Sequence, residues 1–212
     1  MCLPSKIEKP GSTWFLGLDL AQRQDFTALA ALNLEWRNAE QCKVTYNWIR
    51  KPELTLCDLD RYKQGQSYLA YCNLVERRID QIRASEAGAT IQLAIDASGL
   101  DIKIHPVTMN GGAKSSANKH GGQNIPRRSL ITKLILLMEH GTFRADPDIL
   151  NLDEFQHEML NLRANDTAAE STGDLVVATS LAAWQAINTT PELLPTREQR
   201  RTYIAAGTRR LL

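Results

Sequence analysis

Two short apolar runs that each end at an aspartate constrain the fold more than any other feature of this sequence. The run TWFLGLDL at 13–20 reaches Asp19, and the run TIQLAID at 90–96 ends at Asp96. Short, continuous apolar runs predict buried strands. Because α/β proteins place their sites beyond the ends of such strands, we expect both carboxylates at one edge of one sheet.

The surrounding segments predict a mixed α/β sheet with helices on both faces. Further strands are expected at 26–36, at 43–50 and, weakened by Pro106, at 102–109. Helical patterns predict helices at 65–86, 126–140, 148–163 and 174–187. The glycine-rich stretch 110–124 predicts a flexible loop. A right-handed crossover through the 65–86 helix would bring the two aspartate-ended strands side by side.

Length and composition fit one globular domain. The chain has 212 residues, of which 43% are hydrophobic and 23% charged, so it can bury a core without disulfides or structural metals. We expect an irregular lead-in at 1–12, the domain at 13–190 and a basic tail at 191–212. No apolar run suggests a membrane segment or a signal peptide.

Cysteine and histidine spacing argues against a zinc site or a disulfide framework. The cysteines form no CxxC pair and the histidines are scattered. Free thiols fit a reducing cytoplasm.

One window of the chain carries basic residues and no acidic residue. It extends from Ile102 to Met138, although the whole chain has a net charge of only +1. Such a window attracts phosphate groups of a polyanion through charge and counterion release, the alternative being a solvated loop and helix face. Its candidate phosphate-binding residues are Lys114, Lys119, Arg127, Arg128 and Lys133.

A third aspartate, Asp174, begins the most apolar of the predicted helices. Taken alone, each of Asp19, Asp96 and Asp174 is more often a turn residue or a helix cap. Three carboxylates at one sheet edge would repel each other unless a cation lay between them. Mg²⁺ suits such a place, since it binds few carboxylates together with waters and phosphate oxygens.

The sequence also resembles a known family, the nuclease domain of phage terminase large subunits. FLGLDLAQRQDFTALAAL is similar to its first motif, G-x-D followed by D-x-T-A, and LAIDASG to its second, a strand ending D-A-T-G. GDLVVATSLAAW is similar to its third motif, H-D-D-L-V-x-A-x-x-L-A. The intervening segments follow the family's order of strand, glycine-rich loop and two helices, so the resemblance covers about 13–187.

The resemblance implies an RNase H-like mixed sheet flanked by helices, with Asp19, Asp96 and Asp174 as catalytic metal ligands. Two Mg²⁺ or Mn²⁺ ions would serve an endonuclease that cuts phage DNA during genome packaging, one activating water and the other stabilising the leaving oxygen. The implied partners are double-stranded DNA and a separate packaging ATPase, small terminase subunit or portal, in the host cytoplasm.

Two departures from the family pattern stand out. The family's H-D-D is here Thr172-Gly173-Asp174, so one of the paired aspartates is missing. Candidates for a fourth carboxylate are Asp101, Glu158 and Glu170, and Asp25 also matches a family position. The second departure is that no G-x-x-x-x-G-K-[ST] string occurs, so we expect no ATPase motor. A split subunit, a prophage remnant and an excised domain all remain open.

Two other functions remain as alternatives. A RuvC-like junction resolvase would use the same fold and chemistry on another substrate. A non-catalytic DNA-binding or packaging module with a decayed site would explain the missing aspartate.

Overall fold

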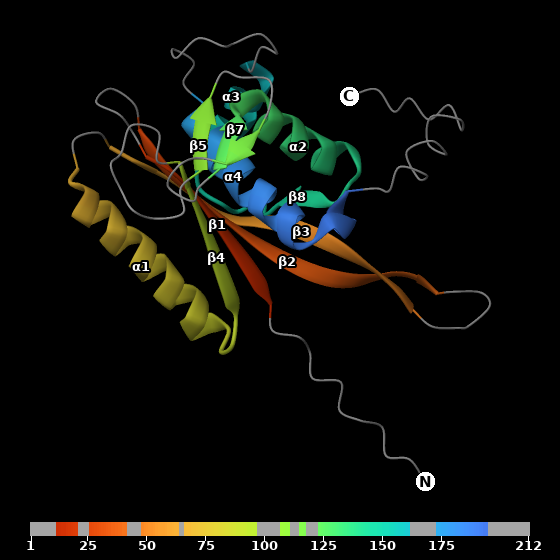
Figure 1. Cartoon of the computed structure of the whole chain (residues 1–212). Coiled ribbons are helices and arrows are strands. Elements are labelled where there is room, and N and C mark those ends of the chain that lie inside the picture. The colour runs from red at the N-terminus through yellow and green to blue at the C-terminus, as the bar shows by residue number, and fades with distance from the viewer. Residues whose placement is uncertain are drawn as a thin grey trace.

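Strand β1 (Thr13–Asp19) lies at the centre of the sheet in the computed structural model (Figure 1). It pairs antiparallel with β2 (Thr27–Gln41) and parallel with β4 (Thr90–Asp96). The structure describes residues 12–20, 26–41, 48–63, 66–96, 107–110, 115–117, 123–161 and 173–194.

The sheet extends in both directions from this centre. On one side β3 (Trp48–Tyr62) pairs antiparallel with β2, and β8 (Phe143–Ala145) pairs parallel with β3. On the other side lie β5 (Val107–Asn110), β7 (Gln123–Pro126) and β6 (Ser116–Ala117). Within the described residues the strand order is β6-β7-β5-β4-β1-β2-β3-β8. β2 and β3 extend together past the helices as a long hairpin arm (Figure 1).

Helices cover both faces of the sheet (Figure 1). Helix α1 (Tyr68–Ser85) covers one face, and the other face carries α2 (Arg127–Glu139), α3 (Leu152–Asn161) and α4 (Asp174–Thr189). A short 3-10 helix, η1 (Pro191–Leu193), follows α4, and its Leu193 is fully buried in the same core. No helix among these residues is both long and apolar enough to cross a membrane.

Alternation along β1 builds a separate core on each face. Leu16 and Leu18 cluster with Val75 and Ile82 of α1, while Phe15 belongs to the larger core that contains α4. This is the two-residue period of a strand that is buried on both faces. The middle of β1, from Phe15 to Leu18, is therefore buried on both faces of the sheet.

Gly17 brings α4 unusually close to β1. A Cβ at this position would overlap the carbonyl oxygen of Ala178 and lie 2.7 Å from the backbone nitrogen of Ala182. Only glycine leaves room for this approach of helix to strand. The contact fixes where α4 crosses the sheet.

The structure confirms the predicted mixed sheet, the helices on both faces and the parallel pairing of 13–19 with 90–96. The predicted helices at 65–86, 126–140, 148–163 and 174–187 correspond to α1 to α4.

Two predictions need correction. The strand expected to end at residue 50 continues to Tyr62 as β3, because its later leucines alternate with polar residues that looked exposed; residues 43–47 lie outside the described part. The expected loop at 110–124 contains β6 and the start of β7, because strands this short leave no periodic pattern in a glycine-rich sequence. Its remaining residues, 111–114 and 118–122, lie outside the described part, as do 102–106 of the expected strand at 102–109.

Candidate metal and nuclease site

Asp19 and Asp96 are brought together by the register of β1 and β4. The two residues are direct partners in the parallel pairing, each at the last position of its strand. Neighbouring strands lie about 4.8 Å apart, so the two side chains stand next to each other if they share a face. Asp96 is buried, with 6% of its surface exposed, and Asp19 is half-buried.

Contacts with α4 show on which face of the sheet Asp19 and Asp96 lie. Gly17 faces Ala178 of α4, and Gln92 accepts a 2.9 Å hydrogen bond from Gln185 of α4. Side chains two and four residues along a strand share a face. Asp19 and Asp96 therefore both stand on the face that α4 covers.

The direction of α4 places its first residue at the same edge. Gln92, near the start of β4, contacts Gln185, whereas Ala94, further along β4, shares a buried cluster with Leu181 and Val177. Helix α4 therefore runs in the opposite direction to β4. The first turn of α4, with the buried Asp174, consequently lies at the strand ends that carry Asp19 and Asp96.

Glu158 of α3 holds that first turn. Its Oε2 atom accepts hydrogen bonds of 3.1 Å from the backbone N–H groups of Leu175 and of Val176. These belong to the N–H groups that a helix start leaves without partners inside the helix, and a carboxylate there also interacts favourably with the helix dipole. Glu158 therefore fixes the position of Asp174 relative to the sheet.

Arg61 of β3 joins the two acidic residues. Its Nη2 atom forms an ion pair with Glu158 Oε1 and lies 3.9 Å from Asp174 Oδ2. Arg61 pairs with Ala28, which pairs with Asp19, so Arg61 lies in the same row across the sheet as Asp19 and Asp96.

Burial is the largest influence on the Glu158 carboxyl and raises its pKa, and the charge of Asp174 acts in the same direction. The two N–H groups and Arg61 oppose this shift. The net direction is upward, since removing a carboxylate from water disfavours its charged form.

The three predicted metal ligands thus share one face and one edge. Among the described residues, no three His, Cys, Asp or Glu side chains already converge closely enough to hold a metal ion. The chemistry of the set still fits a hard divalent cation, because it offers carboxylate oxygens and leaves positions for water and phosphate. Of the fourth-carboxylate candidates, the structure places Glu158 beside Asp174, while Asp25, Asp101 and Glu170 lie outside the described residues.

The predicted DNA-binding residues that can be placed lie around α2. Arg127 is half-buried and Arg128 exposed at the start of this helix. Strands β4, β5 and β7 run parallel, and Val107 and Gln123 stand level with Asp96. Pro126 at the end of β7 is three residues further along, so α2 begins roughly 10 Å beyond the row of Asp96 on the same edge.

Lys133 has a different environment from Arg128. Its Nζ atom lies 5.9 Å from the centre of the Trp184 ring of α4, and burial lowers its pKa. Lys114 and Lys119 lie outside the described residues.

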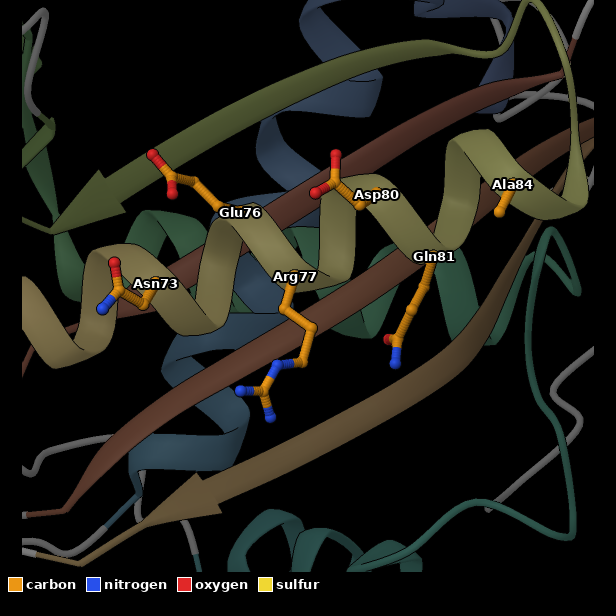
Figure 2. A pocket seen from close by; sticks show the side chains of 6 residues that line it. All are labelled: Asn73, Glu76, Arg77, Asp80, Gln81 and Ala84. Carbon is orange, nitrogen blue, oxygen red and sulfur yellow. The ribbon is translucent and has the colours of Figure 1, made fainter.

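Two surface hollows differ in their relation to this edge. One, of about 570 Å³, is lined by Phe26, Arg61 and Glu158 together with residues of α3. The other, of about 640 Å³, follows the outer side of α1, where Arg77 and Gln81 project to one side and Glu76 and Asp80 to the other (Figure 2). Its lining among the described residues comes from α1 alone, on the face of the sheet opposite α4.

Sequence reasoning missed Arg61. No strand was expected at 54–62, so nothing placed this residue near the aspartates. The only available signal was the alternation of leucines with polar residues in LTLCDLDRY.

Comparisons with known proteins identify the fold. No protein-family model matches the chain, and no curated protein does. Among solved structures, the manganese-soaked terminase nuclease domain of human cytomegalovirus matches with a TM-score of 0.58 and 10% identity, over 91% of this chain and 90% of that one. The same domain, manganese-soaked with an inhibitor bound, gives a TM-score of 0.57 and 11% identity over the same shares.

A third structure, the large terminase nuclease of the thermophilic phage G20c, gives a TM-score of 0.39 and 16% identity over 83% of each chain. The two cytomegalovirus matches show that this chain has the RNase H-like α/β fold of terminase nuclease domains. At this level of identity the likeness concerns the fold.

Proposed function

We propose that this chain is a divalent-metal-dependent endonuclease of the terminase type, acting on DNA. The observation that carries the proposal is the facing pair Asp19 and Asp96 beneath the buried start of α4. Carboxylates this close repel one another, and a divalent cation bound between them would offset that repulsion. The terminase nuclease fold adds independent support.

Asp19, Asp96 and Asp174 would hold two Mg²⁺ or Mn²⁺ ions. Such ions supply charge stabilisation for a phosphoryl centre and raise the acidity of bound water. The chain's own contribution is rigid placement: Asp19 and Asp96 are fixed by strand pairing, and Asp174 by the contacts of Glu158 with the first turn of α4.

The DNA would approach along the edge at which α2 begins. A helix start attracts phosphate through its free N–H groups and dipole, and Arg128 adds an exposed positive charge there. Lys114, Lys119, Arg127 and Lys133 complete the proposed set. Because phosphate contacts carry no base code, binding should depend little on sequence.

We further propose that the substrate is double-stranded phage DNA during packaging in the host cell. The motor would be a separate ATPase, working with a small terminase subunit or a portal. The support for this packaging context is that the fold resembles that of a terminase nuclease domain.

Nicking of a supercoiled plasmid tests the proposal. The purified chain should convert it to open-circular and linear forms with Mg²⁺ or Mn²⁺, and an excess of chelator should stop the reaction. The matched control is Asp80→Asn, which changes an exposed aspartate on the outer side of α1 (Figure 2) and should cut like the parent. Plasmid that stays supercoiled with either ion across a range of pH and salt would contradict the proposal.

A further inference from the structure

Arg61 is a cation built into the proposed metal site. It projects from β3 in the row of Asp19 and Asp96, on the face covered by α4. Its guanidinium forms an ion pair with Glu158 and approaches Asp174 Oδ2 to 3.9 Å. Only a quarter of its side-chain surface is exposed, so water screens these interactions less than it would on an open surface.

The position of Arg61 is held from two sides. Glu158 engages the guanidinium with Oε1 while its other oxygen accepts the N–H groups of Leu175 and Val176. The ring of Phe26 lies 5.2 Å from the guanidinium carbon, at cation–π distance. Arg61 is therefore anchored to the same helix start that positions Asp174.

Both oxygens of Glu158 already have partners in this arrangement. These contacts describe a residue that positions Arg61 and the first turn of α4.

A fixed positive charge beside a metal-binding carboxylate has two opposing effects. Without metal, it offsets part of the repulsion among the clustered carboxylates. When a divalent ion approaches, the positive charge of Arg61 repels the ion, and Arg61 competes with it for the Asp174 carboxylate. We infer that Arg61 acts as a resident cation that stabilises the metal-free site and limits how tightly a divalent ion binds there, an inference that rests on the proposed metal role of Asp174.

The test is calorimetric titration of Mn²⁺ into the folded protein at pH 8, without DNA. Arg61→Gln removes the charge, and Arg61→Met removes it while keeping an unbranched apolar stem against Phe26. Arg61→Lys keeps the positive charge but replaces the planar guanidinium with an ammonium group. Arg144→Gln is the matched control, because Arg144 also lies in the sheet and pairs with an acidic residue, Glu53, but on the edge strand β8.

We expect the Gln and Met variants to bind Mn²⁺ about tenfold more tightly than the parent, since one nearby positive charge is gone. Their metal-free thermal midpoints should fall, and the rise in midpoint on adding Mn²⁺ should be larger than in the parent. The Lys variant should stay close to the parent, and Arg144→Gln should not change the affinity.

Two outcomes overturn the inference in distinguishable ways. If the parent binds Mn²⁺ and the folded Gln or Met variant binds it equally or more weakly, Arg61 does not limit the ion although the metal role stands. If the parent binds no Mn²⁺ at millimolar concentration, the proposed metal role fails and this inference fails with it.

Discussion

Asp19 and Asp96 are direct partners across two parallel strands, and both stand beneath the first turn of α4. The pairing alone puts two carboxylates about one strand spacing apart. Asp174 adds a third at the same edge. A divalent cation bound at this edge would offset the repulsion that remains among these carboxylates beside Arg61.

Asp19→Asn should abolish metal-dependent nicking while leaving the fold intact. The change removes one charge of the cluster and keeps the shape of the side chain, so the thermal midpoint without metal should hold or rise. Plasmid nicking and a thermal melt of the same preparation measure both effects. Asp96→Asn and Asp174→Asn should likewise abolish nicking. Nicking by Asp19→Asn at the parent's rate would refute the assignment.

Gly17→Ala should be among the most destabilising single substitutions in the chain. The new Cβ would overlap Ala178 and crowd Ala182, and overpacking of this kind costs about 1–3 kcal/mol or more. The control is Gly141→Ala, where a Cβ meets nothing within 4 Å but φ is +67°, which should cost about 1 kcal/mol. Urea unfolding compares the two. Equal losses would mean that α4 does not pack against β1 as closely as described.

Cys57 should resist alkylation in the folded protein far longer than Cys72. Burial raises the pKa of the Cys57 thiol to about 11, so at pH 8 roughly one thiol in a thousand is ionised. Cys72 is exposed on α1. Peptide mapping after timed iodoacetamide treatment measures the two rates separately. The protection of Cys57 should weaken as pH rises toward 11 and should vanish in denaturant; equal rates in the native protein at pH 8 would contradict the described burial.

DNA affinity should lose salt dependence when the basic window is neutralised. Changing Lys114, Lys119, Arg127 and Arg128 together to alanine should flatten the log–log slope by several units, at about 0.9 per lost phosphate contact. Lys133→Met alone should flatten the slope by about 0.9 at most, because it removes a single proposed phosphate contact. Fluorescence anisotropy across a salt series gives the slopes. An unchanged slope in the fourfold variant would place the DNA elsewhere, with the arginine-rich segment after Pro195 as the alternative site.

The central strands and the helices could be predicted because their burial produces a recognisable spacing of apolar residues in the sequence. β1 is buried on both faces and appears as a continuous apolar run, and β4 has the bounds expected for it. The prediction that the strands ending at Asp19 and Asp96 are neighbours followed from the crossover rule, whereas the register that makes these two residues direct partners is seen only in the structure.

β3 escaped prediction because its polar residues have partners that are distant in sequence. Asp58 and Asp60 form ion pairs with Arg78 of α1, and Leu54, Leu56 and Leu59 supply the buried side. A register shift in the pairing of β2 with β3 also breaks the simple alternation of these leucines. Charges that look solvent-exposed in the sequence are thus half-buried against a helix.

The positioning residues of the site were harder to predict than its proposed ligands. Aspartates at strand ends can be recognised locally, whereas Arg61 and Glu158 matter through contacts that span 97 residues. Glu158 stood among several candidate carboxylates, and nothing in the sequence distinguished a ligand from a residue that holds a helix start. That distinction depends on which atoms its two oxygens contact.

A crystal of this chain soaked in Mn²⁺ would test the central claim most directly, through anomalous scattering at the manganese edge. The account predicts an anomalous peak within ligand distance of Asp19, Asp96 and Asp174, and its loss in Asp19→Asn crystals soaked in the same way. Manganese found only elsewhere on the protein, with this edge empty in a well-ordered parent crystal, would contradict it.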